Sequence, residues 1–185
     1  MSGSGKTTHA KILAKKNELF HLETGELLRS EMKKNSKESN IIKENLEQKK
    51  LVPDEIIESL ISRKIDEKIE SRGIIFDGFP GNTDQAKFLR DILEEKGTKL
   101  HYIFMLSVDD QTAKKRIKEK DRNNGMNLQM MNEMIKSQKT NIDDVKDYYT
   151  YVLKNKPFIF NSSDSTELVQ DAIEIIIKDQ KSIIS

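Results

Sequence analysis

The stretch from Met1 to Thr8 most constrains what this chain can fold into. Gly3-Ser4-Gly5-Lys6-Thr7 has the composition of the closing half of a P-loop, and a helical pattern follows from Thr8 to Lys16. Glycines let successive backbone N–H groups turn toward one anion, and the N-terminus of the following helix adds its positive dipole end. In such a loop, Lys6 is expected to reach the outer phosphates and the Thr7 hydroxyl to bind a magnesium ion.

The P-loop pattern is incomplete in this chain. It requires an earlier glycine and a strand that leads into the loop, and Met1 stands inside the loop where they are expected. A bare Gly-Lys-Thr is a weak signal, so a solvated Gly/Ser terminus stays open as a second interpretation. Other motifs along the chain must decide between the two.

Composition narrows the class of protein. A chain of 185 residues can form one domain with a full core. Its 32 basic and 31 acidic residues leave a net charge of +1, so we expect neither nucleic acid nor a membrane as a partner. The absence of cysteine excludes disulfides and cysteine-bound zinc. No apolar run could span a bilayer and no signal-peptide pattern is present, so the cytoplasm is the default location.

Helical and strand patterns alternate along the chain. Ile57, Ile61, Ile65 and Ile69 recur every fourth residue and predict a buried helical stripe. A polar break at 121–127 precedes the longest helical pattern. Expected helices cover Glu26–Lys50, the stretch from Asp54, Thr83–Glu95, the stretch from Asp109, 128 to about Leu153, and the stretch from Ser165; expected strands cover Leu19–Leu22, Gly73–Asp77, Tyr102–Val108 and Phe158–Phe160. This alternation predicts an α/β fold with a parallel sheet covered by helices on both faces.

Residues suited to chemistry gather where the expected strands end. Glu23-Thr24-Gly25 follows one strand, and Asp77-Gly78-Phe79-Pro80 ends a strand that we expect to be fully buried. Arg116 lies on the helix after a third strand. Ligands of parallel α/β sheets bind at the C-terminal ends of strands, so these motifs support the phosphate interpretation of the loop around Lys6. Two plainer alternatives stay open. Asp77-Gly78 could form a simple turn, and Arg116 could be a solvated surface charge.

Taken together, these ordered motifs resemble the adenylate kinase family of nucleoside monophosphate kinases over nearly the whole chain. His21 to Arg29 is similar to the segment that binds the monophosphate, and Leu51 to Glu55 to the segment that closes that site. Asp77 to Pro80 with Gln85 matches the central signature of the family. Thr112 to Lys120, with Arg116, resembles the helix that leads into the lid.

The resemblance implies a three-layer P-loop kinase fold with helices on both faces of a parallel sheet. The family strand order is 2-3-1-4-5, and strand 1 is missing here. A longer form is therefore expected to carry that strand before Met1, between the strands that end at Asp77 and Val108. The resemblance further implies a monomer and one domain over residues 1–185, with a monophosphate-binding insert at about 25–58 and a much shortened lid at about 117–127.

The implied reaction is reversible transfer of the terminal phosphoryl group of ATP to a nucleoside monophosphate, with AMP as the expected acceptor and Mg²⁺ as the cofactor. The resemblance implies catalytic roles for Lys6, Asp77, Arg116 and Arg122. It implies ATP binding by Gly3, Ser4, Gly5, Lys6, Thr7, Thr8, Arg116 and Lys120. It implies AMP binding by Thr24, Gly25, Arg29, Val52, Gly78 and Gln85. Magnesium is assigned to Thr7 and Asp77.

Three positions depart from the family pattern. Gly81 stands where the family has an arginine for the acceptor phosphate, and Met134 where it has an arginine on the long helix. Lys120 replaces the second arginine of the lid-entry helix, which keeps the charge but loses the bidentate fork. Losing one partner of a buried charge pair costs about 2–5 kcal/mol. A catalytically weak or silent nucleotide-binding module with a regulatory or structural role therefore stays open beside an active kinase.

Overall fold

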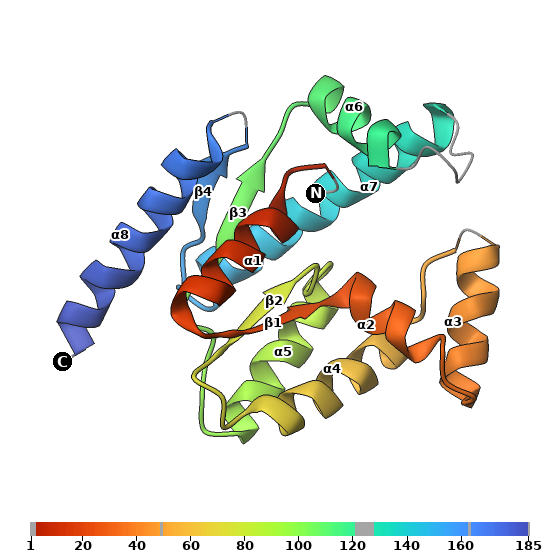
Figure 1. Ribbon diagram of the computed structural model, residues 1–185, viewed down its shortest axis with the longest axis horizontal. Coiled ribbons are helices and arrows are strands. Elements are labelled where there is room, and N and C mark those ends of the chain that lie inside the picture. Colours follow the sequence, from red (N-terminus) through yellow and green to blue (C-terminus); the bar gives the residue numbers. More distant parts are fainter. Residues whose placement is uncertain (1–2, 49, 121–127, 163, 185) are drawn as a thin grey trace. The chain divides into compact units, whose positions relative to one another are not determined.

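The computed structural model describes residues 3–48, 50–120, 128–162 and 164–184 (Figure 1). Helices and short strands alternate along them, as the sequence predicted. The described elements, in chain order, are α1 (Lys6–Asn17), β1 (Phe20–Glu23), α2 (Thr24–Glu31), α3 (Lys37–Glu47), α4 (Asp54–Lys68), β2 (Ile74–Asp77), α5 (Thr83–Glu95), β3 (Phe104–Ser107), α6 (Asp110–Lys120), α7 (Leu128–Asp147), the π-helix η1 (Tyr148–Val152), β4 (Phe158–Asn161) and α8 (Thr166–Ile184).

The described strands form two separate parallel sheets of two strands each. In one sheet β1 pairs with β2, and the register sets Glu23 beside Asp77 at the C-terminal ends of both strands. In the other, β3 pairs with β4, and Ser107 lies beside Asn161. Because the family's strand 1 is missing here, β1 and β2 stand for strands 2 and 3 of the expected order 2-3-1-4-5, and β3 and β4 for strands 4 and 5. The two observed pairs therefore agree with the outer pairs of that order, and the fold is of the predicted α/β class.

The chain divides into two compact units. Unit 1 comprises Met1–Leu13 and His101–Ser185, and unit 2 comprises Ala14–Leu100. Each unit has its own apolar core. The core of unit 2 is centred on α4 and α5, and the smaller one of unit 1 on α6 and α7. The prediction of one domain over residues 1–185 stays a prediction, as do the bounds of the insert and the lid.

Helix α4 shows how the apolar stripe was partly mispredicted. Ile61 and Ile65 are completely buried, and each contributes about 1.5–3 kcal/mol through removal of its side chain from water. Ile69, the last residue of the predicted stripe, is 37 % exposed. Ile69 is the C-cap of α4 and keeps helical backbone angles (φ −60°, ψ −31°), so it continues the stripe beyond the residues that the core covers.

Two other predicted elements differ from the structure. The helical region expected over Glu26–Lys50 is broken into α2 and α3, because the Ser36 hydroxyl accepts a hydrogen bond from the backbone N–H of Ser39 at 3.0 Å and starts a new helix. The strand ending at Asp77 is only half-buried over its apolar residues Ile74 to Phe76, because β2 pairs with β1 alone among the described strands. Asp77 itself is buried, as expected.

The long helix expected to reach Leu153 is α-helical only to Asp147. It continues as η1, where the wider π turn covers Tyr148 to Val152. The polar break predicted at 121–127 lies outside the described residues. Among the helices that the structure describes, none is both long and apolar enough to cross a membrane.

Candidate functional site

The glycine-rich loop adopts a conformation suited to anion binding. Gly3 and Gly5 have φ angles of +77° and +81°, which residues with a side chain rarely adopt. There is also no room for a side chain at Gly3, because a Cβ atom there would lie 3.0 Å from the Ala113 carbonyl oxygen of α6. Between the glycines, Ser4 is buried. Alternation of left-handed and ordinary backbone is the geometry that turns successive N–H groups toward one point.

Helix α1 begins directly after this loop. The Gly5 carbonyl accepts hydrogen bonds from the backbone N–H groups of Thr8 and His9 at 3.0 and 3.2 Å, which closes the first turn. Lys6 and Thr7 therefore stand in that first turn, where an anion meets the positive end of the helix dipole. The buried Ser4 and the closed first turn show a packed terminus rather than a solvated one, and phosphate binding by this loop stays a prediction.

Arg116 of α6 links this loop to the end of β4. Its Nη1 donates to the Gly3 carbonyl oxygen at 3.0 Å and to the Ser162 hydroxyl at 3.4 Å. Its Nη2 donates to the Ser162 carbonyl oxygen at 3.3 Å. The planar guanidinium thus spans two chain segments that are far apart in the sequence, which a lysine ammonium could not do from one position. The structure brings this predicted residue against the loop.

A second contact holds α1 from the side of α8. The Gln170 side-chain Nε2 donates to the His9 Nδ1 at 2.9 Å and to the His9 carbonyl oxygen at 3.2 Å. Gln170 is buried, and burial lowers the pKa of His9 below its ordinary value. Because Nδ1 accepts a hydrogen bond here, the neutral ring carries its hydrogen on Nε2.

In unit 2, charged residues gather at the C-terminal ends of β1 and β2. The Asp77 carboxylate is almost fully buried and accepts a hydrogen bond from His21 Nε2 at 3.2 Å. Thr24 Oγ1 donates to the Asp77 carbonyl oxygen at 3.2 Å. The chain then turns at Gly78, whose φ of +85° again favours glycine. Asp77 is thus held by neighbours on both its side chain and its backbone.

Arg29 belongs to the same edge of the unit. Its Nη2 donates to the Glu23 carboxylate at 3.1 Å, and 62 % of its side chain is exposed. A Cβ atom at Gly25 would lie 3.1 Å from Arg29 Nη1, so glycine leaves room for this arginine to cross over the start of α2. Because the arginine of this ion pair is largely exposed, an anionic ligand can reach Arg29 from solvent.

Gln85 of α5 is buried, and each end of its side-chain amide makes a hydrogen bond. Its Nε2 donates to Asp54 Oδ1 at 2.6 Å, and its Oε1 accepts from the backbone N–H of Gly81 at 2.7 Å. Val52, which precedes α4, is buried in the core of unit 2. The structure therefore brings two predicted AMP-binding residues into the packed junction between α4 and α5.

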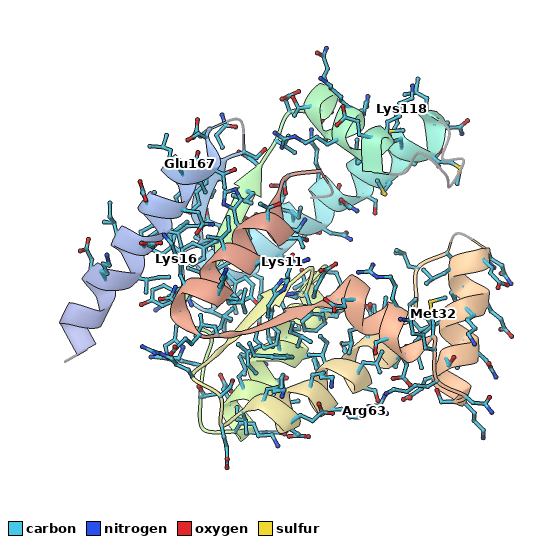
Figure 2. The ribbon with its side chains drawn as sticks, viewed as in Figure 1. Lys11, Lys16, Met32, Arg63, Lys118 and Glu167 are labelled. Carbon is cyan, nitrogen blue, oxygen red and sulfur yellow. The ribbon has the colours of Figure 1, made fainter. Side chains whose placement is uncertain are left out.

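The helices of the predicted insert are tied to one another by polar contacts. Arg63, which projects from α4, donates to the Glu38 carboxylate of α3 at 2.9 Å (Figure 2). The Ser39 hydroxyl of α3 donates to the backbone carbonyl of Met32 at 3.2 Å. The buried Glu31 carboxylate accepts from Lys34 Nζ at 2.7 Å, and this bond lowers the pKa of Glu31. These contacts fix α3 on α2 and α4.

The predicted site residues fall into two groups, one in each unit. Unit 1 holds the loop residues Gly3, Ser4, Gly5, Lys6, Thr7 and Thr8 together with Arg116 and Lys120, the last residue of α6. Unit 2 holds Thr24, Gly25, Arg29, Val52, Asp77, Gly78 and Gln85. Arg122 lies outside the described residues. The magnesium pair Thr7 and Asp77 takes one residue from each unit and stays a prediction.

The chemistry of this pair suits magnesium. Both side chains offer hard oxygen donors, and Asp77 has only 3 % of its side chain exposed. Magnesium keeps several waters and takes few protein ligands when it is bound with nucleotide phosphates, so a dedicated acidic cage is not needed. Among the described residues no group of three or more His, Cys, Asp or Glu side chains could form such a cage.

Comparison with known proteins decides the family. A family model described as adenylate kinase matches residues 1–185. The chain belongs to the adenylate kinase family. An adenylate kinase of Parabacteroides distasonis is 35 % identical over 150 residues, covering 80 % of this chain and 79 % of that protein. One of Nautilia profundicola is 30 % identical over 184 residues, covering 98 % and 94 %. One of Rickettsia bellii is 33 % identical over 173 residues, covering 94 % and 76 %. Membership in the adenylate kinase family supports a nucleoside monophosphate kinase.

Several contacts of the site were missed from the sequence. His21 contacts Asp77 and His9 is held by Gln170, and the sequence analysis assigned neither contact. Asp54 was predicted only as the start of a helix, yet it accepts a hydrogen bond from Gln85. The parallel pairing of β1 with β2 was a signal for the His21 contact, since it sets the ends of both strands side by side. The partners of His9 and Asp54 left no signal in the sequence.

Proposed function

We propose that this chain is an adenylate kinase that reversibly transfers the terminal phosphoryl group of ATP to AMP. The observation that carries the proposal is the loop of Gly3 and Gly5, both at positive φ, which opens α1 and is held through its backbone by Arg116. An anion cradle joined to a permanently charged arginine suits a polyphosphate donor. Family membership adds the acceptor, because the matched relatives bear the name adenylate kinase.

On the donor side, the backbone N–H groups of the loop and Lys6 bind the outer phosphates, and Thr8 stands in the first turn of α1 beside them. Arg116 lies against the nucleotide or its phosphates while it keeps its contact with Gly3. Lys120 and Arg122 would supply further positive charge for the transferring group. Phosphoryl transfer needs positioning and charge stabilisation more than covalent chemistry, which fits a set of residues without a nucleophile.

On the acceptor side, the exposed Arg29 exchanges its Glu23 partner for the phosphate of AMP. Thr24, Gly25 and Gly78 shape the backbone near that phosphate, and Val52 and Gln85 meet the base. Gln85 suits adenine because a primary amide carries both a donor and an acceptor.

Thr7 and Asp77 are the residues that would hold Mg²⁺. When bound, this ion offsets the negative charge that builds up on the phosphates. His21 keeps the Asp77 carboxylate oriented through its hydrogen bond at 3.2 Å. Burial of this carboxylate limits competition from bulk water for the same oxygen atoms.

A silent nucleotide-binding module is the second candidate. It is favoured by Gly81, which offers no side chain to the acceptor phosphate, and by Lys120, which lacks the arginine fork. In that case Arg29 alone holds the acceptor phosphate, and in-line geometry is poorly fixed. Such a protein binds ATP without appreciable turnover.

A phosphoryl-transfer assay separates these functions. ATP and Mg²⁺ are supplied with AMP, UMP, CMP or GMP, and nucleoside diphosphates are quantified by chromatography. We expect diphosphate formation with AMP at a higher kcat/KM than with the other acceptors, and loss of turnover when EDTA removes the metal. Faster turnover of UMP or CMP would overturn AMP preference. ATP binding by calorimetry without any diphosphate product would support the silent module.

A further inference from the structure

Gln85 lies inside a closed ring of hydrogen bonds that joins the start of α4 to the loop before α5. Its Nε2 donates to Asp54 Oδ1 at 2.6 Å, and its Oε1 accepts from Gly81 N–H at 2.7 Å. The other oxygen of Asp54 accepts from Asn82 Nδ2 at 2.8 Å. Asn82 Oδ1 in turn accepts from the backbone N–H of Gln85 at 2.9 Å. The ring therefore holds the amide of Gln85 at both ends.

The chemistry of the two partners allows only one orientation of this amide. A carboxylate can only accept, so the NH₂ end of Gln85 must face Asp54. A backbone N–H can only donate, so the oxygen end must face Gly81. Rotating the amide by half a turn would set oxygen against oxygen and N–H against N–H. Because Gln85 is only 5 % exposed, water could not relieve either mismatch.

We propose that Asp54 is a specificity-determining positioning residue, which locks the donor and acceptor ends of Gln85 and so selects the hydrogen-bonding polarity of the acceptor base. This inference rests on the proposed function, in which Gln85 meets the base of the monophosphate. Asp54 acts through Gln85 and contacts the rest of the ring rather than the base. Each end of the Gln85 amide keeps one further site for a hydrogen bond, since the NH₂ group has a second hydrogen and the oxygen a second lone pair.

An amide held in one orientation distinguishes bases by the order of the hydrogen-bond donor and acceptor on their pairing edge. The pairing edge of adenine offers an acceptor at N1 and a donor at its 6-amino group. Hypoxanthine has nearly the same shape but the reverse pattern, with a donor at N1 and an acceptor at O6. A freely rotating glutamine could satisfy either base, whereas one held by Asp54 and Gly81 satisfies only one polarity in a given pose. A site built for one hydrogen-bonding pattern rejects the other because buried polar groups stay unpaired.

The test compares AMP with IMP as acceptors in the intact chain and in Asp54→Asn. Asparagine has the same shape but can present either an oxygen or an NH₂ group to Gln85, so the flipped amide is no longer excluded at that end. We expect the ratio of kcat/KM for AMP to that for IMP to fall by about tenfold, the lower end of what a hydrogen bond to a charged group is worth. Glu55→Gln is the matched control, because it removes an exposed carboxylate from the same helix turn and should leave the ratio unchanged.

A second variant guards against loss of fold. Asn82→Ser removes the Nδ2 donor to Asp54 but keeps a hydroxyl that can accept from the backbone N–H of Gln85 and cap α5, so it loosens Asp54 while the Gln85 side-chain amide keeps both partners. We expect a smaller fall in the AMP/IMP ratio, about threefold. Urea unfolding midpoints of all variants report their stability. A purely structural role for Asp54 lowers the midpoint while the ratio stays at the wild-type value, and that result would overturn the proposal.

The outcomes also separate this inference from the proposed function. AMP turnover with an AMP/IMP ratio near one in the wild-type chain would overturn the role of Asp54 and leave the kinase standing. If the protein neither binds nor phosphorylates AMP or IMP, the proposed function and this inference fail together. If AMP binds in calorimetry without turnover, the same ratio is measured as Kd, and an unchanged ratio in Asp54→Asn again overturns the proposal.

Discussion

Arg116 and Gly3 meet through a hydrogen bond of 3.0 Å from the guanidinium Nη1 to the glycine carbonyl oxygen. The donor comes from the middle of α6 and the acceptor from the loop before α1, so the contact joins segments separated by more than half the chain. The other arm of Arg116 is held by Ser162 at the end of β4. A charged side chain is thus anchored to the backbone of the very loop whose N–H groups are proposed to bind phosphate.

The first prediction concerns this anchor. Arg116→Lys should weaken ATP binding about tenfold, because a single ammonium cannot keep the contacts to Gly3 and Ser162 while facing the nucleotide. The Kd for ATP is measured by calorimetry. Lys115→Gln, which removes an exposed charge from the neighbouring position of α6, is the control and should change affinity less than twofold. Equal effects of both variants would mean that only the overall charge of α6 matters.

The second prediction concerns the backbone of the loop. Gly3→Ala should destabilise the protein by about 1–3 kcal/mol, since alanine is strained at a φ of +77°. The added Cβ would also meet the Ala113 carbonyl at 3.0 Å. ATP affinity should fall with it, because the loop must shift to make room. Urea unfolding and ATP titration provide both measurements.

Gly97→Ala is the matched control for this strain. Gly97 follows α5 at a φ of +69°, and nothing lies within 4 Å of the Cβ atom that would be added. We expect a cost of about 1 kcal/mol from the backbone alone and no change in ATP affinity. Equal ATP affinities for the Gly3 and Gly97 variants would show that the shape of the loop is unimportant for binding.

The third prediction concerns the arginine that the family has at the place of Gly81. Gly81→Arg should tighten AMP binding by about 1–3 kcal/mol, the range for a hydrogen bond to a charged group. The backbone permits this change, because Gly81 is not among the glycines with positive φ and its added Cβ would lie 3.4 Å from Gln85 Oε1. AMP affinity and turnover are compared with Gly81→Ala, which has the same Cβ without the charge. If the two variants bind AMP alike and both fold, this position does not meet the phosphate.

The fourth prediction is a pH dependence of stability at His9. Burial lowers the pKa of His9 below 6.5 in the folded protein, so the unfolded chain binds more protons between these two pKa values. Stability is therefore fully present above pH 6.5 and is lost as pH falls toward the folded pKa. Protonation would also set an Nδ1–H against the donor of Gln170.

His9→Asn isolates this effect. The asparagine Oδ1 can take the place of Nδ1 as an acceptor but does not titrate near neutral pH. We expect the wild-type chain to lose more stability than this variant between pH 8 and pH 5.5 in urea unfolding. His101→Gln, at an exposed position, should behave as the wild type does. Identical pH profiles for wild type and His9→Asn would rule out a contribution from His9.

Local patterns were sufficient for much of the fold. Thr83–Glu95 was predicted with the bounds that α5 has, because Asn82 is a good helix cap and apolar residues recur at helical spacing behind it. Asp77 was expected to be buried at a strand end and is. The break between α2 and α3 was missed, although Ser36 has the residue type of a helix cap, because a polar, lysine-rich stretch has no clear apolar period.

By itself, then, the sequence determined the alternation of strands and helices and the glycine-rich loop, since each depends on residues close together in the chain. The tertiary structure alone decided which side chains meet: Arg116 with Gly3, Gln170 with His9, and Asp54 with Gln85. Local propensity and hydrophobic spacing act over a few residues, whereas these partners lie tens of residues apart. Their hydrogen bonds form only when folding brings the segments into contact, so no short pattern records them.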